Sequence, residues 1–262
     1  CASPASCLRC GVKLVFVISS YRLVPFIRLG IMQLRKLAPD DMIMVSDDPS
    51  PQSAEIENIA KEFGLLYKGA RVRRGHFGGD FQSFVNGLSF ARANGCDVMV
   101  KVSQRFVFRK LEAVEVFRKA FSNPNIDAVT PGKPDVKGNN RMSAGFGAFG
   151  TLSDIVGIRA SAMSPEQMLD LYRARLLREK VPWASFIECL VDELHSNVFP
   201  GRTMKLPELT NPTADPIYLR RYQAQEKDYH ALALSHGFNG HFPLGEWGQI
   251  EGNAYICKPV VV

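Results

Sequence analysis

Two aspartates and a serine-glutamine-arginine triplet stand where apolar segments of this chain end. The residues are Asp47, Asp48, Ser103, Gln104 and Arg105. A guanidinium binds anionic oxygens through paired hydrogen bonds, and a carboxylate accepts hydrogen bonds from N–H and hydroxyl groups. Strand alternation would place Lys101, Ser103 and Arg105 on one face, with Gln104 opposite. These residue types predict a site for an anionic ligand that also carries hydrogen-bonding groups.

The apolar segments that end in these residues alternate with segments of helical spacing. Continuous or nearly continuous apolar runs at residues 12–18, 41–45, 65–67 and 98–102 are typical of parallel strands buried on both faces. Residues 25–37, 55–63 and 81–94 carry apolar side chains at helical spacing, and a glycine follows each of the last two segments. This order predicts an α/β fold with a Rossmann-like, mostly parallel sheet and helices on both faces.

Ligands of such sheets bind beyond the carboxyl ends of the strands. The first apolar run ends in a polar turn that contains Ser19, Tyr21 and Arg22. We therefore expect this turn, the two aspartates and the triplet to converge on one edge of the sheet. The Asp-Asp-Pro-Ser sequence at residues 47–50 is also typical of a turn that caps a helix, so a structural role for Asp47 stays open.

The second half of the chain is less regular. Its patterns indicate helices at residues 111–121, 164–180, 183–195 and 218–237, and strands at 127–130, 146–152 and 204–209. Nothing in the sequence marks a linker, so we predict a single domain over residues 12–262. Residues 1–11 are interpreted as an N-terminal extension or a remnant of cloning.

Composition narrows the class of protein. The chain has 262 residues, of which 46% are hydrophobic, and a net charge of +6. No apolar stretch approaches the roughly 20 residues that cross a bilayer, and Cys7 and Cys10 lack the second pair that a zinc ribbon needs. Basic and aromatic residues are not interleaved, so we do not expect nucleic acid as a partner. We expect a cytoplasmic protein, with peripheral membrane association as an open alternative.

Residues 12–108 resemble the nucleotide-sugar half of a GT-A glycosyltransferase. The matching features are the strand-end sequences at residues 19–22 and 47–50, the Gly78-Gly79-Asp80 stretch followed by Asn86 and Ala91, and the strand at 98–102. The resemblance implies a GT-A-like fold in which residues 109–262 hold the acceptor. It also implies that Ser19, Tyr21, Arg22 and Asp47 hold the base and ribose, and that Gly78, Gly79 and Asn86 flank the diphosphate and sugar. Glycines before a helix would let backbone amides approach phosphate closely.

The chain departs from that family where its metal motif would stand. Asp-x-Asp is replaced by Ser103, Gln104 and Arg105, which are poor ligands for the hard cations that carboxylates hold. We therefore expect no metal and no other cofactor, with Lys101, Arg105 and Arg109 stabilising the diphosphate charge. The alternative is a decayed site in a non-catalytic relative.

An inverting transferase also needs a base that deprotonates the acceptor hydroxyl. The resemblance implies that this base is a carboxylate in the second half of the chain. Glu188 and Asp192 are four residues apart and would share one helix face, and burial beside Trp183 and Phe186 would raise a carboxyl pKa. These two are our predicted catalytic residues, although an ordinary amphipathic helix would show the same pattern. Asp154, Glu246 and Glu251 are further candidates.

These observations predict a metal-independent, inverting transferase of hexosyl or related sugars. Its partners would be a nucleotide-sugar donor and a glycan or lipid-linked acceptor, as in polysaccharide biosynthesis. Two alternatives stay open, a nucleotidyltransferase and a non-catalytic nucleotide- or sugar-binding module. The first needs metal-binding carboxylates and a Gly-rich basic segment after the first strand, which residues 19–22 match poorly. No hydrolase elbow, zinc-protease helix or Walker loop is present.

Overall fold

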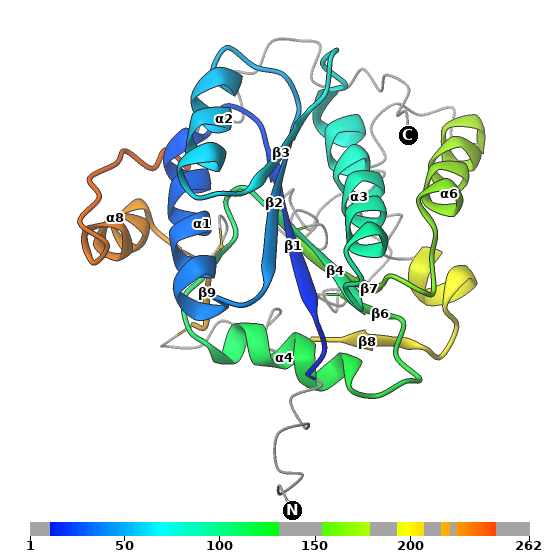
Figure 1. Ribbon diagram of the computed structural model, residues 1–262. Helices are drawn as coiled ribbons and strands as arrows, with labels where there is room; N and C mark the ends of the chain where they lie inside the picture. Colours follow the sequence, from blue (N-terminus) through cyan, green and yellow to red (C-terminus); the bar gives the residue numbers. More distant parts are fainter. Residues whose placement is uncertain (1–10, 131–153, 179–192, 207–215, 221–223, 245–262) are drawn as a thin grey trace, which may run out of the picture.

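A computed structural model describes residues 11–130, 154–178, 193–206, 216–220 and 224–244. Its elements follow the alternation expected from the sequence (Figure 1). In chain order they are β1 (Leu14–Ser20), α1 (Val24–Leu37), β2 (Met42–Asp47), α2 (Ser53–Glu62), β3 (Leu66–Gly69), α3 (Gly75–Ala93), β4 (Val98–Ser103), β5 (Val107–Phe108), α4 (Glu112–Phe121), β6 (Ala128–Thr130), β7 (Ile155–Arg159), α6 (Pro165–Arg178), the π-helix η1 (Leu194–Val198), β8 (Thr203–Lys205), β9 (Tyr218–Leu219) and α8 (Glu226–Leu234).

Seven of the strands form one mixed sheet in the order β3-β2-β1-β4-β7-β6-β8. Strands β1 to β4 are parallel, whereas β7 runs antiparallel to both β4 and β6. Strands β5 and β9 pair in a separate antiparallel ribbon. The predicted α/β class with a mostly parallel sheet is confirmed.

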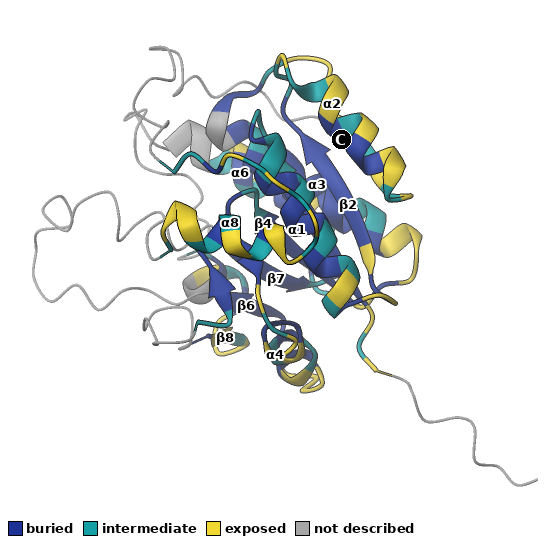
Figure 2. Cartoon of the chain, turned by 90° about the vertical axis from the view of Figure 1, so that its left-hand side faces the viewer, coloured by how far each residue is buried: buried dark blue, intermediate teal, exposed yellow. Residues whose placement is uncertain are grey.

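Helices cover both faces of the sheet, with α1 and α2 on one side and α3 and α6 on the other (Figure 1). Alternate residues of the central strands supply the two apolar layers, because successive side chains of a strand point to opposite faces. Phe16 and Val100 pack with α1, α2 and α4, while Val17 and Met99 pack with α3 and α6. The inner strands β1, β4 and β7 and most of β2 are buried, whereas the edge strands β3 and β8 are largely exposed. Exposed residues also lie on the outward sides of α2, α4 and α8 (Figure 2).

Three elements differ from the sequence prediction. Helix α3 begins at Gly75 and not near residue 81, because the carboxylate that caps it comes from Asp48, 27 residues earlier. Strand β7 occupies Ile155–Arg159, where the sequence patterns indicated no helix or strand. The single helix predicted at residues 218–237 is wrong, since Tyr218–Leu219 pairs with β5 and α8 begins after a capping box formed by Gln225 and Asp228.

No helix among the described residues is long and apolar enough to cross a membrane.

Candidate functional site

The carboxyl ends of β1, β2 and β4 lie side by side. Ser20 is paired with Asp47 across β1 and β2, and Ser19 with Ser103 across β1 and β4. The predicted convergence of the three polar stretches on one sheet edge is therefore confirmed.

The turn after β1 presents an aromatic ring that contacts two cations. The guanidinium carbon of Arg22 lies 5.0 Å from the centre of the Tyr21 ring, and that of Arg73 lies 4.9 Å from it. Gln104 fixes the turn, because its Oε1 accepts a hydrogen bond from the Tyr21 amide at 2.8 Å. Arg22 has a φ of 65°, in the left-handed region that residues other than glycine rarely adopt. Two guanidinium groups and an aromatic ring thus meet at the sheet edge.

Asp47 makes its hydrogen bonds inside the protein. One oxygen accepts a hydrogen bond from the Ser20 hydroxyl, and the other accepts from Ser53 at 2.6 Å and from Tyr67 at 2.9 Å. The residue is only 3% exposed. Its carboxylate joins β1, α2 and β3, so the alternative of a structural role has direct support, while binding of a ribose or base by Asp47 stays a prediction.

Asp48 caps helix α3. Its carboxylate oxygens accept hydrogen bonds from the amides of Arg74 at 2.7 Å and Gly75 at 3.1 Å. Gly79 lies within the helix and against this carboxylate, since a Cβ on Gly79 would be 2.9 Å from the Asp48 Cβ. The expectation that Gly78 and Gly79 precede a helix is wrong, and two of the amides at the helix start are already engaged by Asp48.

Burial raises the pKa of Asp48 from 3.8 to about 6, despite the two amide donors. Because the folded-state pKa lies above the ordinary value, the folded protein keeps this proton to higher pH than the unfolded chain does. The contribution of Asp48 to the free energy of unfolding should therefore fall as pH rises from about 4 to about 6 and stay constant above that. In Asp48→Asn this fall should be absent. Urea denaturation of both proteins at pH 4, 5, 6 and 7 measures the difference, and a difference that does not change with pH would contradict the assignment.

A buried polar cluster lies beneath the end of β4. Lys101 Nζ is 2.9 Å from Asp80 Oδ1, and the Ser19 hydroxyl donates to the same oxygen at 2.6 Å. Ser83 donates to the Ser19 hydroxyl at 3.1 Å, and Lys101 is fully buried. The positive charge of Lys101 is thus directed toward a carboxylate of α3, so contact between this cation and a diphosphate at the edge has no direct support.

Arg105 lies on the other side of the sheet from Lys101. Strand β4 ends at Ser103, so alternation does not extend to Arg105. The Lys101 ammonium lies 5.9 Å from the ring centre of Phe84 in α3, whereas the guanidinium carbon of Arg105 lies 5.9 Å from that of Phe26 in α1. The prediction that Lys101 and Arg105 share a strand face is wrong.

The remaining predicted residues are distributed as follows. Asn86 is buried and donates to the Ser46 hydroxyl at 2.9 Å. Arg109 is exposed and its Nη1 contacts the carbonyl oxygen of Pro216 at 3.5 Å. Glu188 and Asp192 lie outside the described residues, as do the further candidates Glu246 and Glu251.

Sequence reasoning did not identify Arg220, and it ranked Asp154 below Glu188. Asp154 precedes β7, and its carbonyl oxygen accepts a hydrogen bond from the Ser103 amide at 2.7 Å. Arg220 follows β9, and its Nε lies 3.8 Å from Asp154 Oδ2. The one sequence signal was the two-residue segment Tyr218-Leu219 directly before an arginine. The interpretation of residues 218–237 as a helix concealed this signal.

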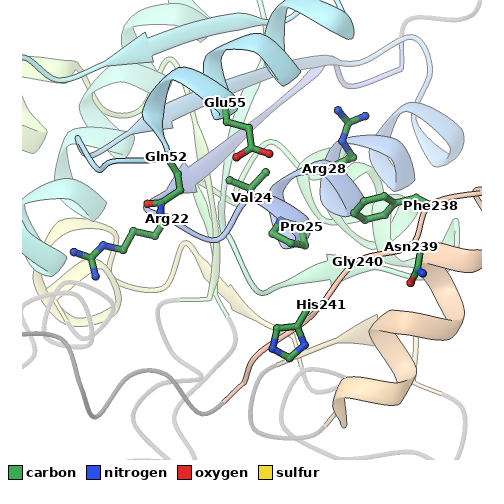
Figure 3. Close-up of a pocket in the computed structure, with 10 residues that line it drawn as sticks. All are labelled: Arg22, Val24, Pro25, Arg28, Gln52, Glu55, Phe238, Asn239, Gly240 and His241. Carbon is green, nitrogen blue, oxygen red and sulfur yellow. The ribbon is translucent and has the colours of Figure 1, made fainter.

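A pocket of about 460 Å³ adjoins the β1 turn on the α1 and α2 side (Figure 3). Pro25 in α1 and Glu55 in α2 line it, and Phe238 and His241 line it from the segment after α8. The Arg22 side chain extends away from the others in Figure 3, in keeping with its contact with Tyr21. The lining combines groups of both charges with apolar surface.

No group of three or more His, Cys, Asp or Glu side chains suited to a metal occurs within the part of the chain that the structure describes. The expectation of a metal-free site stays a prediction.

The sheet order, the antiparallel β7 and the strand-end site define a mixed α/β fold of the kind found in GT-A glycosyltransferases and in nucleotidyltransferases. The chain is similar to a cytidylyltransferase from Leptospira borgpetersenii, with a TM-score of 0.50 and 13% identity over 95% of this chain and 98% of that one. It is also similar to a glycosyltransferase involved in glycosylation of the major capsid of PBCV-1, with a TM-score of 0.50 and 10% identity over 85% and 99% of the two chains. Neither protein-family models nor the curated proteins give a match to the sequence. These likenesses establish the fold.

Proposed function

We propose that this protein is a glycosyltransferase that transfers a sugar from a nucleotide-diphosphate donor to a glycan or lipid-linked acceptor without a bound metal. The observation that carries the proposal is the strand-end edge itself. The Tyr21 ring contacts both Arg22 and Arg73 there, and β4 ends in Ser103, followed by Gln104, in place of carboxylates. An aromatic ring can stack on a base, and guanidinium groups can neutralise phosphate charge.

The carboxylates near this edge support a transferase without metal over a metal-dependent nucleotidyltransferase. Asp47, Asp48, Asp80 and Asp154 each contact donors or cations of the protein. A divalent cation would have to compete with those partners for its ligands. Glu188 or Asp192 remains the proposed base that deprotonates the acceptor, and inversion remains the favoured outcome.

Calorimetric titration with UDP-, GDP-, dTDP- and CMP-sugars, with and without EDTA, tests the proposal. We expect one nucleotide class to bind with an affinity that EDTA does not change. Binding to none of them would contradict the proposed function, and loss of binding on chelation would contradict its metal-free form. Pyrophosphate release from a nucleoside triphosphate and a sugar phosphate would favour the nucleotidyltransferase instead.

Variants in the segment between β3 and α3, which carries Arg71 and Arg73, refine this test. Arg73→Ala should weaken donor binding about tenfold, because a guanidinium that stacks on an aromatic ring and meets phosphate contributes about 1–2 kcal/mol. Arg71→Ala removes the same charge from an exposed position two residues away and should change the affinity less than twofold. Equal effects of the two variants would indicate general electrostatics and no specific contact. Glu188→Gln should keep donor binding and abolish transfer.

A further inference from the structure

Arg220 is carried to the end of β4 by the small β5–β9 ribbon. Leu219 pairs with Val107 in that ribbon, so the next residue, Arg220, lies at the level of the chain just after Arg105. The hydroxyl of Tyr229 in α8 donates to the Arg105 carbonyl oxygen at 2.6 Å and fixes this junction. Residues from the C-terminal third of the chain therefore reach the same sheet edge as Ser103.

The guanidinium of Arg220 is buried and makes no hydrogen bond to any residue that the structure describes. The side chain is 2% exposed, and none of its three nitrogens has a hydrogen-bond partner among the described residues. Its ionic contact is with Asp154 at 3.8 Å, which is too long for a hydrogen bond. Asp154 Oδ2 likewise has no hydrogen-bond partner within the described part of the chain. A buried charge with its donors unused is costly, and a bound ligand that accepts those hydrogen bonds would remove the cost.

The position of Arg220 indicates what kind of ligand would accept its hydrogen bonds. Asp154 is joined to Ser103 by the 2.7 Å hydrogen bond between backbone atoms, so the Asp154–Arg220 pair lies beside the end of β4. Burial lowers the pKa of Arg220 and raises that of Asp154, which shows that the surroundings of both groups disfavour their charges. A guanidinium in such surroundings binds a phosphate oxygen strongly, because few water molecules compete.

We propose that Arg220 is an anion-binding residue that donates hydrogen bonds to the phosphate oxygens of a nucleoside diphosphate, and that Asp154 is the internal counter-ion that partly offsets the charge of its guanidinium while no ligand is bound. This inference rests on the proposed function, because the diphosphate is that of the sugar donor. When the bond between the sugar and the diphosphate breaks, its electron pair stays on the departing diphosphate, and Arg220 stabilises that charge. Lys101 and Arg105 were expected to do this, but Lys101 contacts Asp80 and Arg105 contacts Phe26.

The test compares the affinities of the nucleoside diphosphate and the matching nucleoside by calorimetry, using the nucleotide class that the wild-type protein binds. Arg220→Gln should weaken diphosphate binding at least tenfold and change nucleoside binding less than twofold. Arg220→Lys keeps the charge without the planar fork and should give an intermediate affinity. Asp154→Asn should leave diphosphate binding unchanged or strengthen it, because the competing carboxylate charge is gone.

Arg202→Gln is the matched control. Arg202 also pairs with a buried carboxylate, that of Asp127 at 3.0 Å. This pair lies at the opposite end of β4, because Asp127 also contacts Arg159, which is paired with Val98 at the start of β4. Its loss should leave both affinities unchanged.

The possible results separate the two proposals. If the wild-type protein binds no nucleotide or nucleotide-sugar, the proposed function itself fails. If the wild-type protein binds but Arg220→Gln keeps the wild-type diphosphate affinity, the inference about Arg220 is wrong. It is also wrong if Arg220→Gln and Asp154→Asn weaken diphosphate and nucleoside alike, since that pattern marks a structural ion pair. Loss of affinity confined to an anionic acceptor would overturn it too, because the anion would then come from the other substrate.

Discussion

Lys101→Met is expected to lower the free energy of unfolding by about 3–5 kcal/mol. The ammonium of Lys101 lies 2.9 Å from Asp80 with both side chains almost completely buried. Removing the cation takes a close counter-charge away from a carboxylate that water cannot solvate. Methionine keeps most of the length and apolar volume of the lysine chain, so cavity formation adds little. Urea denaturation at pH 7 measures the change.

The double variant Lys101→Met/Asp80→Asn identifies the source of that loss. Because neither charge remains, it should be considerably more stable than Lys101→Met alone, and the cycle should give a coupling of about 1–3 kcal/mol. The amide oxygen of the introduced asparagine can still accept the hydrogen bond that Ser19 donates to Asp80 at 2.6 Å. Additive losses in the double variant would show that packing, and not charge pairing, makes Lys101 important.

Gly87→Ala is expected to lower the free energy of unfolding by about 1–3 kcal/mol, although alanine favours a helix. A Cβ at Gly87 would lie 2.6 Å from Val17 Cγ2 and 2.7 Å from Met99 Cγ. Val17 is fully buried in the middle of β1, and its branched side chain has little freedom to turn away. Helix α3 would have to move off the sheet, together with the residues that it places at the edge.

Gly30→Ala is the control for this variant. Gly30 also lies inside a helix, but a Cβ there would meet nothing within 4 Å. The substitution should therefore raise the free energy of unfolding by about 0.5–1 kcal/mol. Thermal and urea denaturation of the two variants should give changes of opposite sign. Similar stabilities would contradict the close contact of α3 with β1 and β4.

The sheet and its ligand edge could be predicted because they depend on local patterns. Buried parallel strands read as continuous apolar runs, such as the one that ends at Ser19, and parallel topology alone then brings the strand ends together. Asp47 and Ser103 were placed correctly at that edge for this reason.

The contacts of individual side chains could not be predicted in the same way. Whether Asp48 binds a ligand or caps α3 depends on where a helix 27 residues later begins. Lys101 was expected to bind an anion, but its ammonium pairs with Asp80, which the sequence could not place beside it. Arg105 does not share a face with Lys101, because β4 ends two residues before it. Arg220 was missed because a two-residue strand gives almost no periodic signal, and its strand character comes only from pairing with β5.

The pairing of β5 with β9 also determines the order in which the edge can be assembled. Tyr229 and Arg105, which meet at this ribbon, are 124 residues apart in the chain. Closing so long a loop costs conformational entropy before any contact repays it, and contacts of high sequence separation tend to form late. During synthesis the ends of β1, β2 and β4 emerge well before Arg220 does. We therefore expect a folding intermediate that contains the parallel strands and α3, with the edge completed only when the ribbon docks.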